Sequence, residues 1–289
     1  MWREDRFIAF SQNFIADPNL VKRLIKQSCI SISDIVIDIG AGKGAITKLL
    51  SKSCKEVVAI ELDRKLYTCL AHDLYEKNIT LIHNDILKVG LPRSNYKVFS
   101  NIPFNYTSRI MNKLYFRNNP PKCAYLIMQR EAAKLYAGLS RETQKSLLLK
   151  PFFSIETFHK FRKNDFRPVP SVDINMVKIE KLENPLVDKK DRPEYFDFVV
   201  YGTTRYKRNL KKSLSKIFTH EQFKRLSKKL AFDLEAKPLD LKHTQWVALY
   251  YYYKDGVESK KKLIVNGAYT RQRILQNRLK KVYRTICDL

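Results

Sequence analysis

Cysteine is scarce in this sequence, and its few copies are scattered. The 289 residues include five cysteines, an odd number, and no two of them have the spacing of a metal-ligand pair. We therefore expect neither a disulfide framework nor a bound metal. Each cysteine is expected to be a reduced thiol, in the core or at the surface.

Long apolar runs are also missing. No run approaches the roughly 20 residues that a membrane-spanning helix needs. Residues 1–5 (MWRED) are charged and lead to no apolar segment of a signal peptide. We expect a soluble, cytoplasmic protein without a membrane partner.

Acidic residues are few relative to basic ones. The chain has 29 Asp and Glu against 55 Lys and Arg, a net charge of +26. Residues 181–289 hold 26 basic and 12 acidic residues, which leaves 29 and 17 for the rest, so the two parts carry +14 and +12. A field of this sign and size favours a polyanion such as a nucleic acid as partner.

The strongest motif lies in residues 35–44. A β-branched run, residues 35–39, includes Asp38 and is followed by Gly40, Ala41, Gly42 and Gly44, after which residues 45–50 resume a helical pattern. Alternating glycines allow a close backbone approach to a ligand, but the spacing is neither that of the dinucleotide motif nor that of a P-loop. The shorter turn predicts S-adenosylmethionine rather than NAD.

Polar side chains also end the next two predicted strands. Glu61 closes residues 57–61, about 20 residues beyond the glycine turn, where doubly wound folds place the acid that binds ribose hydroxyls. Asn84, Asp85 and Ile86 follow residues 79–82, and Asp85 is suited to accept from an adenine amino group. An ordinary Asn-Asp turn is the alternative for the second site.

A fourth apolar run, residues 97–100, is followed directly by Asn101, Ile102, Pro103 and Phe104. Asn offers one acceptor and two donors, Pro restricts both its own backbone and that of Ile102, and Phe offers a flat face. Two carbonyl oxygens and a stacking surface are suited to an amino group on an aromatic ring. An ordinary strand-to-helix turn is the alternative.

Taken in order, these segments resemble the ribosomal RNA adenine-N6 dimethyltransferases. The likeness rests on residues 11–14 (SQNF), 38–44, Glu61, Asn84-Asp85 and residues 101–104, together with a Pro-x-Pro-x-Val segment in residues 166–172. Phe10 before Ser11 with almost no N-terminal extension, and Ile at position 102, favour the erythromycin-resistance type, which acts on large-subunit (23S) RNA. The alternative is the housekeeping type, which acts on small-subunit (16S) RNA.

The resemblance implies roles for individual residues. Asn101 and the carbonyl of Ile102 would bind the target amino group, with Pro103 shaping the turn and Phe104 stacking on the base; many members of the family carry Tyr where Phe104 stands. The residues implied for S-adenosylmethionine are Gln12, Asn13, Phe14, Asp38, Gly40, Ala41, Gly42, Gly44, Glu61, Asn84, Asp85, Ile86 and Asn101. No metal is implied.

The expected fold class is α/β. A Rossmann-like methyltransferase domain in residues 1–182 would precede a smaller all-α, RNA-binding domain in residues 183–259 and a basic tail in residues 260–289. The tail would form a short amphipathic helix or be partly disordered. We expect a monomer that partners with ribosomal RNA, 23S rather than 16S. The rival hypothesis is a methyltransferase-like fold retained as a non-catalytic RNA-binding or assembly factor.

Overall fold

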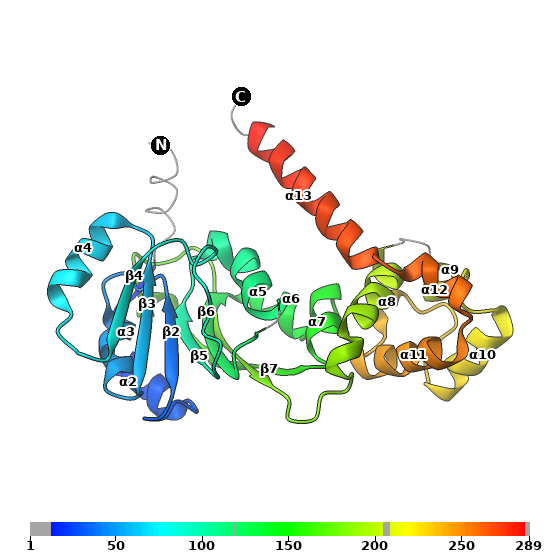
Figure 1. The fold of residues 1–289 in the computed structure, drawn as a ribbon, viewed down its shortest axis with the longest axis horizontal. Coiled ribbons are helices and arrows are strands. Elements are labelled where there is room, and N and C mark those ends of the chain that lie inside the picture. Colours follow the sequence, from blue (N-terminus) through cyan, green and yellow to red (C-terminus); the bar gives the residue numbers. More distant parts are fainter. Residues whose placement is uncertain (1–12, 118, 205–208, 287–289) are drawn as a thin grey trace. The chain divides into compact units, whose positions relative to one another are not determined.

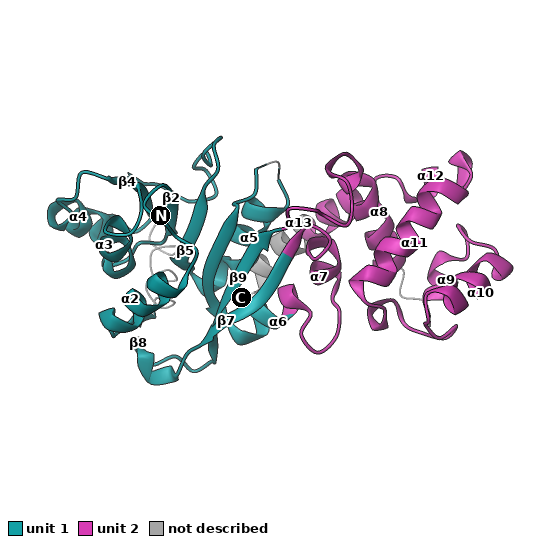
Figure 2. Ribbon diagram, turned by 90° about the horizontal axis from the view of Figure 1, so that it is seen from below, with its two compact units in different colours: residues 1–134, 154–181 teal, residues 135–153, 182–289 magenta. Residues whose placement is uncertain are grey.

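The computed structural model describes residues 13–117, 119–204 and 209–286. It divides into two compact units, residues 1–134 with 154–181 and residues 135–153 with 182–289 (Figure 2). The first unit thus ends one residue before the predicted boundary, whereas residues 135–153 lie in the second unit rather than in the first. That either unit folds as an independent domain stays a prediction.

A seven-stranded sheet forms the centre of the first unit, in the order β4-β3-β2-β5-β6-β9-β7 (Figure 1). Strands β2 to β6 are parallel to one another, and β9 is antiparallel to β6. The bounds are β2 Ile35–Ile39, β3 Glu56–Glu61, β4 Ile79–His83, β5 Lys97–Asn101, β6 Cys123–Gln129, β7 Phe153–Lys160 and β9 Ile174–Lys181. The apolar runs at residues 35–39, 57–61, 79–82 and 97–100 therefore predicted β2, β3, β4 and β5 to within one residue at each end.

Helices cover this sheet because their apolar stripes and the strands share one core. Helix α2 buries Leu20, Val21, Leu24 and Ile25 in a cluster that also contains residues of α3, β2, β5 and β6. Asp17 caps α2 by accepting from the backbone N–H of Asn19. The helices that begin in this unit are α2 Pro18–Gln27, α3 Ala45–Ser51, α4 Arg64–Asp73, α5 Thr107–Tyr115 and α6 Arg130–Ala137, with the 3-10 turns η1 Phe104–Tyr106 and η2 Lys163–Asp165.

Strands β2 and β5 separate at their carboxyl ends. Their backbone pairing is confined to Val36–Lys97 and Ile37–Val98. Beyond it, the Ser100 hydroxyl donates to the Ile39 carbonyl at 2.6 Å and accepts from the Ile39 N–H at 3.1 Å. Because the chain leaves β2 toward β3 on one side and returns to β5 on the other, this is the point where an open α/β sheet forms its binding crevice.

A small second sheet fixes the segment that precedes α2. Strands β1 (Phe14–Ile15) and β8 (Phe166–Arg167) are antiparallel, with Phe14 opposite Arg167. The Arg167–Pro168 peptide bond is cis. The Pro-x-Pro-x-Val segment thus follows a strand that holds Phe14.

The second unit is helical, as expected for the C-terminal part. Its core is aromatic, with Tyr195, Phe198, Trp246, Tyr250 and Tyr253 almost fully buried. The helices are α7 Gln144–Leu149, α8 Arg192–Thr204, α9 Leu210–Leu214, α10 His220–Lys229, α11 His243–Gly256, α12 Ser259–Val265 and α13 Ala268–Ile286, with the 3-10 turns η3 Lys189–Asp191 and η4 Pro238–Asp240.

The basic tail forms α12 and α13, and α13 is 19 residues long rather than short. The carboxylate of Asp197 on α8 accepts from the backbone N–H groups of Gly267 and Tyr269, at 2.7 and 2.9 Å, so it satisfies donors at the start of α13. The sequence pattern gave no sign of this contact, because Asp197 lies about 70 positions upstream of the helix start.

Candidate active site

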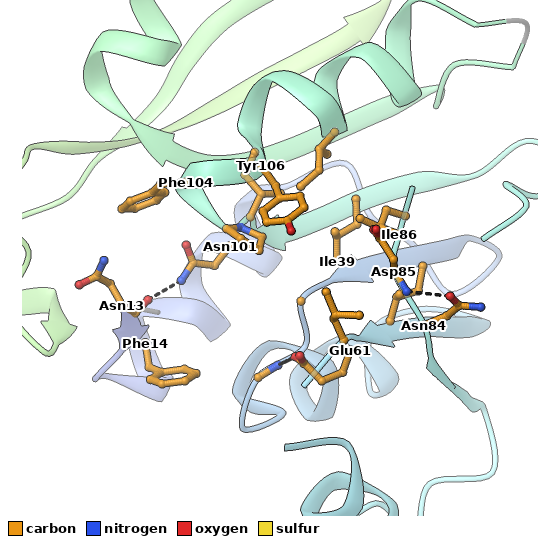
Figure 3. Close-up of a pocket in the computed structure, with 17 residues that line it drawn as sticks. Asn13, Phe14, Ile39, Glu61, Asn84, Asp85, Ile86, Asn101, Phe104 and Tyr106 are labelled. Atoms are coloured by element: carbon orange, nitrogen blue, oxygen red, sulfur yellow. Dashed lines mark hydrogen bonds between the residues drawn. The ribbon is translucent and has the colours of Figure 1, made fainter. Parts of the chain in front are cut away.

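A cavity lies at the carboxyl ends of β2, β3, β4 and β5, in the first unit (Figure 3). It encloses about 810 Å³, its open mouth included. The side chains and backbone that line it are Asn13, Phe14, Ile39, Gly40, Gly42, Ile60, Glu61, Leu62, Asn84, Asp85, Ile86, Asn101, Ile102, Pro103, Phe104, Tyr106 and Ile110. Residues from five separate sequence motifs therefore meet at one site.

The glycine turn shapes one wall of the cavity. Gly42 has a φ of +59°, and a Cβ added there would lie 2.7 Å from Cε1 of Phe14. Gly40 has a φ of +73°, and the N–H groups of Gly40 and Ala41 both donate to the Ile60 carbonyl. The turn needs glycine both for its left-handed backbone and for its close approach to Phe14.

Glu61 is fixed at the base of the cavity. Its side chain accepts from the backbone N–H of Gly42 at 2.7 Å through Oε2 and from that of Asp63 at 2.8 Å through Oε1. The residue is only 3% exposed. Each carboxylate oxygen has a second lone pair, so Glu61 can still accept hydroxyl groups of a ligand.

Asn84 and Asp85 form the predicted turn beside Ile86. The Asn84 side chain accepts from the Asp85 N–H at 2.8 Å, and Oδ1 of Asp85 accepts from the Leu87 N–H at 2.8 Å. These bonds leave Oδ2 of Asp85 as the carboxylate oxygen available to a ligand. Both hypotheses for this segment, an ordinary turn and a ligand-binding acid, are thus compatible with the geometry. The turn itself positions the Asp85 carboxylate.

Asn101 is held in one orientation. Its Nδ2 donates to the backbone carbonyl of Asn13 at 2.6 Å (Figure 3). A carbonyl can only accept, so this contact assigns the amide nitrogen to that side and leaves Oδ1 as the free acceptor. The Ile102 N–H donates to the Ile127 carbonyl at 3.3 Å, which continues the attachment to β6.

Tyr106 lines the cavity although the sequence reading gave it no role. Figure 3 shows its hydroxyl directed into the cavity, whereas the Phe104 ring lies on the other side of Asn101. The guanidinium of Arg109 lies 5.1 Å from the centre of the Tyr106 ring. Ile39, Ile60 and Leu62 were also missed, although each is adjacent in the sequence to a predicted residue. Ile110 was missed as well; it lies one helical turn beyond Tyr106.

Three of the predicted cofactor residues, Asp38, Ala41 and Gly44, do not line the cavity. Gly44 is the N-cap residue of α3, where a Cβ would lie 2.6 Å from Leu70. Gln12 lies outside the described residues. The remaining predicted residues all line the site.

Asp38 is buried behind the glycine turn rather than beside a ligand. It is 1% exposed, and its Oδ2 accepts from the Thr47 hydroxyl at 2.7 Å. Burial raises the pKa of Asp38 to about 7, with a smaller contribution from the nearby Glu61 carboxylate and an opposing one from the Thr47 hydrogen bond. Asp38 therefore connects β2 to α3 and stabilises the turn from within.

The charge of the lining indicates which ligands fit. It contains the carboxylates of Glu61 and Asp85 and no lysine or arginine among its described residues. Such a site repels a pyrophosphate but suits the ammonium and sulfonium charges of S-adenosylmethionine. The side chains of Ile60, Leu62 and Ile86 add an apolar surface to this lining.

A model of the family described as ribosomal RNA adenine dimethylase matches residues 6–255, most of the chain. The chain belongs to this family. The ribosomal RNA small subunit methyltransferase A of Mycoplasmopsis pulmonis is 30% identical over 245 residues, which cover 83% of this chain and 96% of that protein. An rRNA adenine N-6-methyltransferase of Bacillus licheniformis is 30% identical over 243 residues, covering 83% and 84%.

Solved structures show the same fold. The 23S rRNA methyltransferase ErmE aligns with a TM-score of 0.77 at 22% identity, over 84% of this chain and all of that one. A dimethyladenosine transferase from Plasmodium falciparum aligns with a TM-score of 0.66 at 20% identity, over 84% and 98%. The Rossmann-like fold with a helical C-terminal part is confirmed.

These findings confirm the resemblance to the ribosomal RNA adenine-N6 methyltransferases that the motifs indicated. The protein is an rRNA adenine-N6 methyltransferase that uses S-adenosylmethionine. This disfavours the non-catalytic hypothesis. Within the described residues, no helix is both long enough and apolar enough to cross a membrane.

Proposed function

We propose that residues 101–104 bind the target adenine. Oδ1 of Asn101 and the backbone carbonyl of Ile102 accept hydrogen bonds from its exocyclic amino group, and the Phe104 ring stacks on the base. The observation that carries this proposal is the Asn101–Asn13 hydrogen bond at 2.6 Å, because it fixes Nδ2 on the side of Asn13 and leaves Oδ1 available as an acceptor for the amino group. An adenine must leave its stack to reach such a pocket, and an unpaired adenine does so at least cost.

The cofactor occupies the part of the cavity that contains the two carboxylates. Glu61 accepts from the ribose hydroxyls, Asp85 from the adenine amino group, and the turn from Gly40 to Gly42 packs against the methionine part beside Asn13 and Phe14. Asp38, Ala41 and Gly44 act on the cofactor through this turn and not by contact.

Orientation provides most of the catalysis in this proposal. S-adenosylmethionine supplies the methyl group as a cationic sulfonium. The lone pair of the adenine amino nitrogen is delocalised into the ring, and two acceptors favour a more tetrahedral nitrogen whose lone pair points at the methyl group. Asn101 and Ile102 therefore act by positioning and electrostatics. The methyl–sulfur bond breaks as the methyl–nitrogen bond forms, and the nitrogen, now cationic, releases its proton to water. The transfer therefore requires no strong base and no metal.

The proposed substrate is an adenine of 23S rRNA, and the proposed consequence is resistance to macrolide, lincosamide and streptogramin B antibiotics. Ile102 in the tetrapeptide and the relatives named rRNA adenine N-6-methyltransferase support this choice. A relative named as a small-subunit enzyme is equally similar at 30% identity, so 16S rRNA is the alternative.

The helical unit and the basic tail supply RNA contacts in this proposal, because residues 181–289 carry a net charge of +14. The protein acts as a monomer on ribosomal RNA in the cytoplasm.

The test is methyl transfer from labelled S-adenosylmethionine to protein-free large-subunit and small-subunit RNA, side by side, with mapping of the modified base. We expect N6-methylated adenine in 23S rRNA and weaker macrolide binding to ribosomes assembled from it. Label confined to 16S rRNA would replace this assignment by the small-subunit alternative. Label at a position other than adenine N6 would contradict the proposed base pocket.

A further inference from the structure

Two cysteines and a glutamate that are distant in the sequence converge at the end of the sheet opposite the active site. Cys123 is the first residue of β6, and Glu180 stands directly opposite it on β9. Residues directly opposite one another in an antiparallel pair project from the same face. Cys29 follows the C-terminal end of α2. The ligand atoms of the three residues all lie within 4.8 Å of one another.

Side chains from the sheet fix the position of Cys29. The Tyr125 hydroxyl accepts from the Cys29 N–H at 2.9 Å, and Tyr125 lies two residues after Cys123, hence on the same face of β6. The ammonium of Lys97, which stands opposite Cys123 on β5, donates to the Cys29 carbonyl and to Asp34. Hydrogen bonds at its N–H and its carbonyl thus fix the backbone of Cys29. A ligand site requires that its residues be held in place in this way before the ligand binds.

We propose that Cys29, Cys123 and Glu180 form a binding site for a thiophilic divalent cation such as Zn²⁺. Sulfur and carboxylate oxygen are ligands that Zn²⁺ prefers, at about 2.3 and 2.0 Å, and tetrahedral geometry then separates ligand atoms by about 3.7 Å. The observed upper limit of 4.8 Å requires only small side-chain rotations to reach this value. A water molecule completes the coordination.

Exposure and charge around the cluster are compatible with a bound cation. Cys123 is fully buried, whereas Cys29 is exposed and Glu180 is partly exposed, so the ion enters from one side. Lys178 contacts Oε2 of Glu180 at 2.7 Å, which leaves the other carboxylate oxygen for the metal.

The site has a structural role and not a catalytic one. Cys123 begins β6, whereas Ile127, opposite Asn101, lies near the other end of the same strand. A bound ion would join the end of α2 to β6 and β9 and would stabilise the first unit. The sequence spacing concealed this possibility, because the three residues are contributed by segments about 60 to 90 positions apart.

The experiment titrates the full-length, reduced protein with Co²⁺ as a spectroscopic probe, using a reductant without thiols. We expect one Co²⁺ per chain with a thiolate-to-cobalt charge-transfer band, displacement by Zn²⁺, and a higher thermal unfolding temperature with Zn²⁺. Cys29→Ser and Glu180→Gln should each weaken binding at least tenfold. Cys69→Ser and Cys287→Ser are the matched controls and should bind as the unaltered protein does.

Absence of the charge-transfer band in the unaltered protein would overturn the proposal. So would binding that survives unchanged in both Cys29→Ser and Glu180→Gln, or binding that disappears in either control. Cys29 is exposed, and circular dichroism of its variant verifies that the loss of binding is not a loss of folding.

Discussion

At the scale of single residues, the active site depends on individual hydrogen bonds, which the replacement of a single side-chain atom would remove. The bond from Nδ2 of Asn101 to the Asn13 carbonyl fixes the orientation of the amide and leaves its Oδ1 as a free acceptor. Glu61 is joined to the glycine turn by the hydrogen bond that it accepts from the Gly42 N–H. The functional groups are thus bound to one another before any ligand arrives, which limits the reorganisation that the reaction requires.

Gly42→Ala should weaken cofactor binding. The added Cβ would lie 2.7 Å from the Phe14 ring at a φ of +59°, so either the turn or Phe14 must shift. We expect the KM for S-adenosylmethionine to rise about tenfold or more, with little change in RNA affinity. Gly90→Ala is the matched control, because a Cβ at Gly90 meets nothing within 4 Å. Equal KM values for the two variants would contradict the assigned role of the turn.

At the scale of elements, the sequence predicted what depends on local pattern. The apolar runs of β2 to β6 are marked by β-branched residues, and the polar groups at their ends indicated the crevice because parallel strands present their carboxyl ends together. The family resemblance then assigned the residues. Asp38 faces Thr47 of α3 and not the cavity, and periodicity does not distinguish a residue facing a ligand from one facing a helix.

Features that arise from long-range contact could not be predicted. Tyr106 lines the cavity because η1 turns its side chain inward, and no pattern in residues 104–107 specifies that turn. The cluster of Cys29, Cys123 and Glu180 depends on strand register. The start of α13 is capped by Asp197, a residue of α8.

The start of α11 provides an element-scale prediction about pH. Glu142 accepts from His243, the first residue of α11, and also from Ser146 and Lys150. Burial alone would raise the pKa of Glu142, but the hydrogen bonds from these three side chains outweigh it and lower the pKa to about 2. A lowered carboxyl pKa adds stability above the unfolded-state pKa of about 4.5, and that stability is lost as the pH falls toward 2.

We therefore expect Glu142→Gln to cost on the order of 2 kcal/mol at pH 6 and much less at pH 2.5. The measurement is urea unfolding followed by the fluorescence of Trp246, which is buried in the same unit. Glu183→Gln is the control, because Glu183 is an exposed residue of that unit; this variant should change the stability little at either pH. A cost for Glu142→Gln that is the same at both pH values would contradict the coupling.

At the scale of the whole molecule, the net charge of +26 is the feature that relates the chain to its substrate class. The charge is spread over both units, but α13 carries six basic residues and no acidic one. It also lies beyond residue 255, where the match to the family ends. Arg271, Arg273 and Arg278 on this helix are exposed. We expect α13 to bind RNA phosphates.

Replacing these three arginines by glutamine should reduce the salt dependence of RNA binding. Each lost phosphate contact lowers the slope of log K against log salt by about 0.7 to 0.9, so the slope should fall by about 2 to 2.7. The KM for S-adenosylmethionine should not change. The control replaces Lys26, Lys52 and Lys55, which are exposed lysines of the first unit, by glutamine. Equal slopes for the two triple variants would show that α13 has no special role.

The most direct test of the central claim is the single-turnover rate of methyl transfer by Asn101→Ala at saturating S-adenosylmethionine and RNA. Asn105→Ala is the control, because Asn105 is exposed and does not line the cavity. If Oδ1 of Asn101 orients the target amino group, the rate should fall by about 10²-fold or more, while the dissociation constants of cofactor and RNA change little. An unchanged rate in Asn101→Ala would contradict the account.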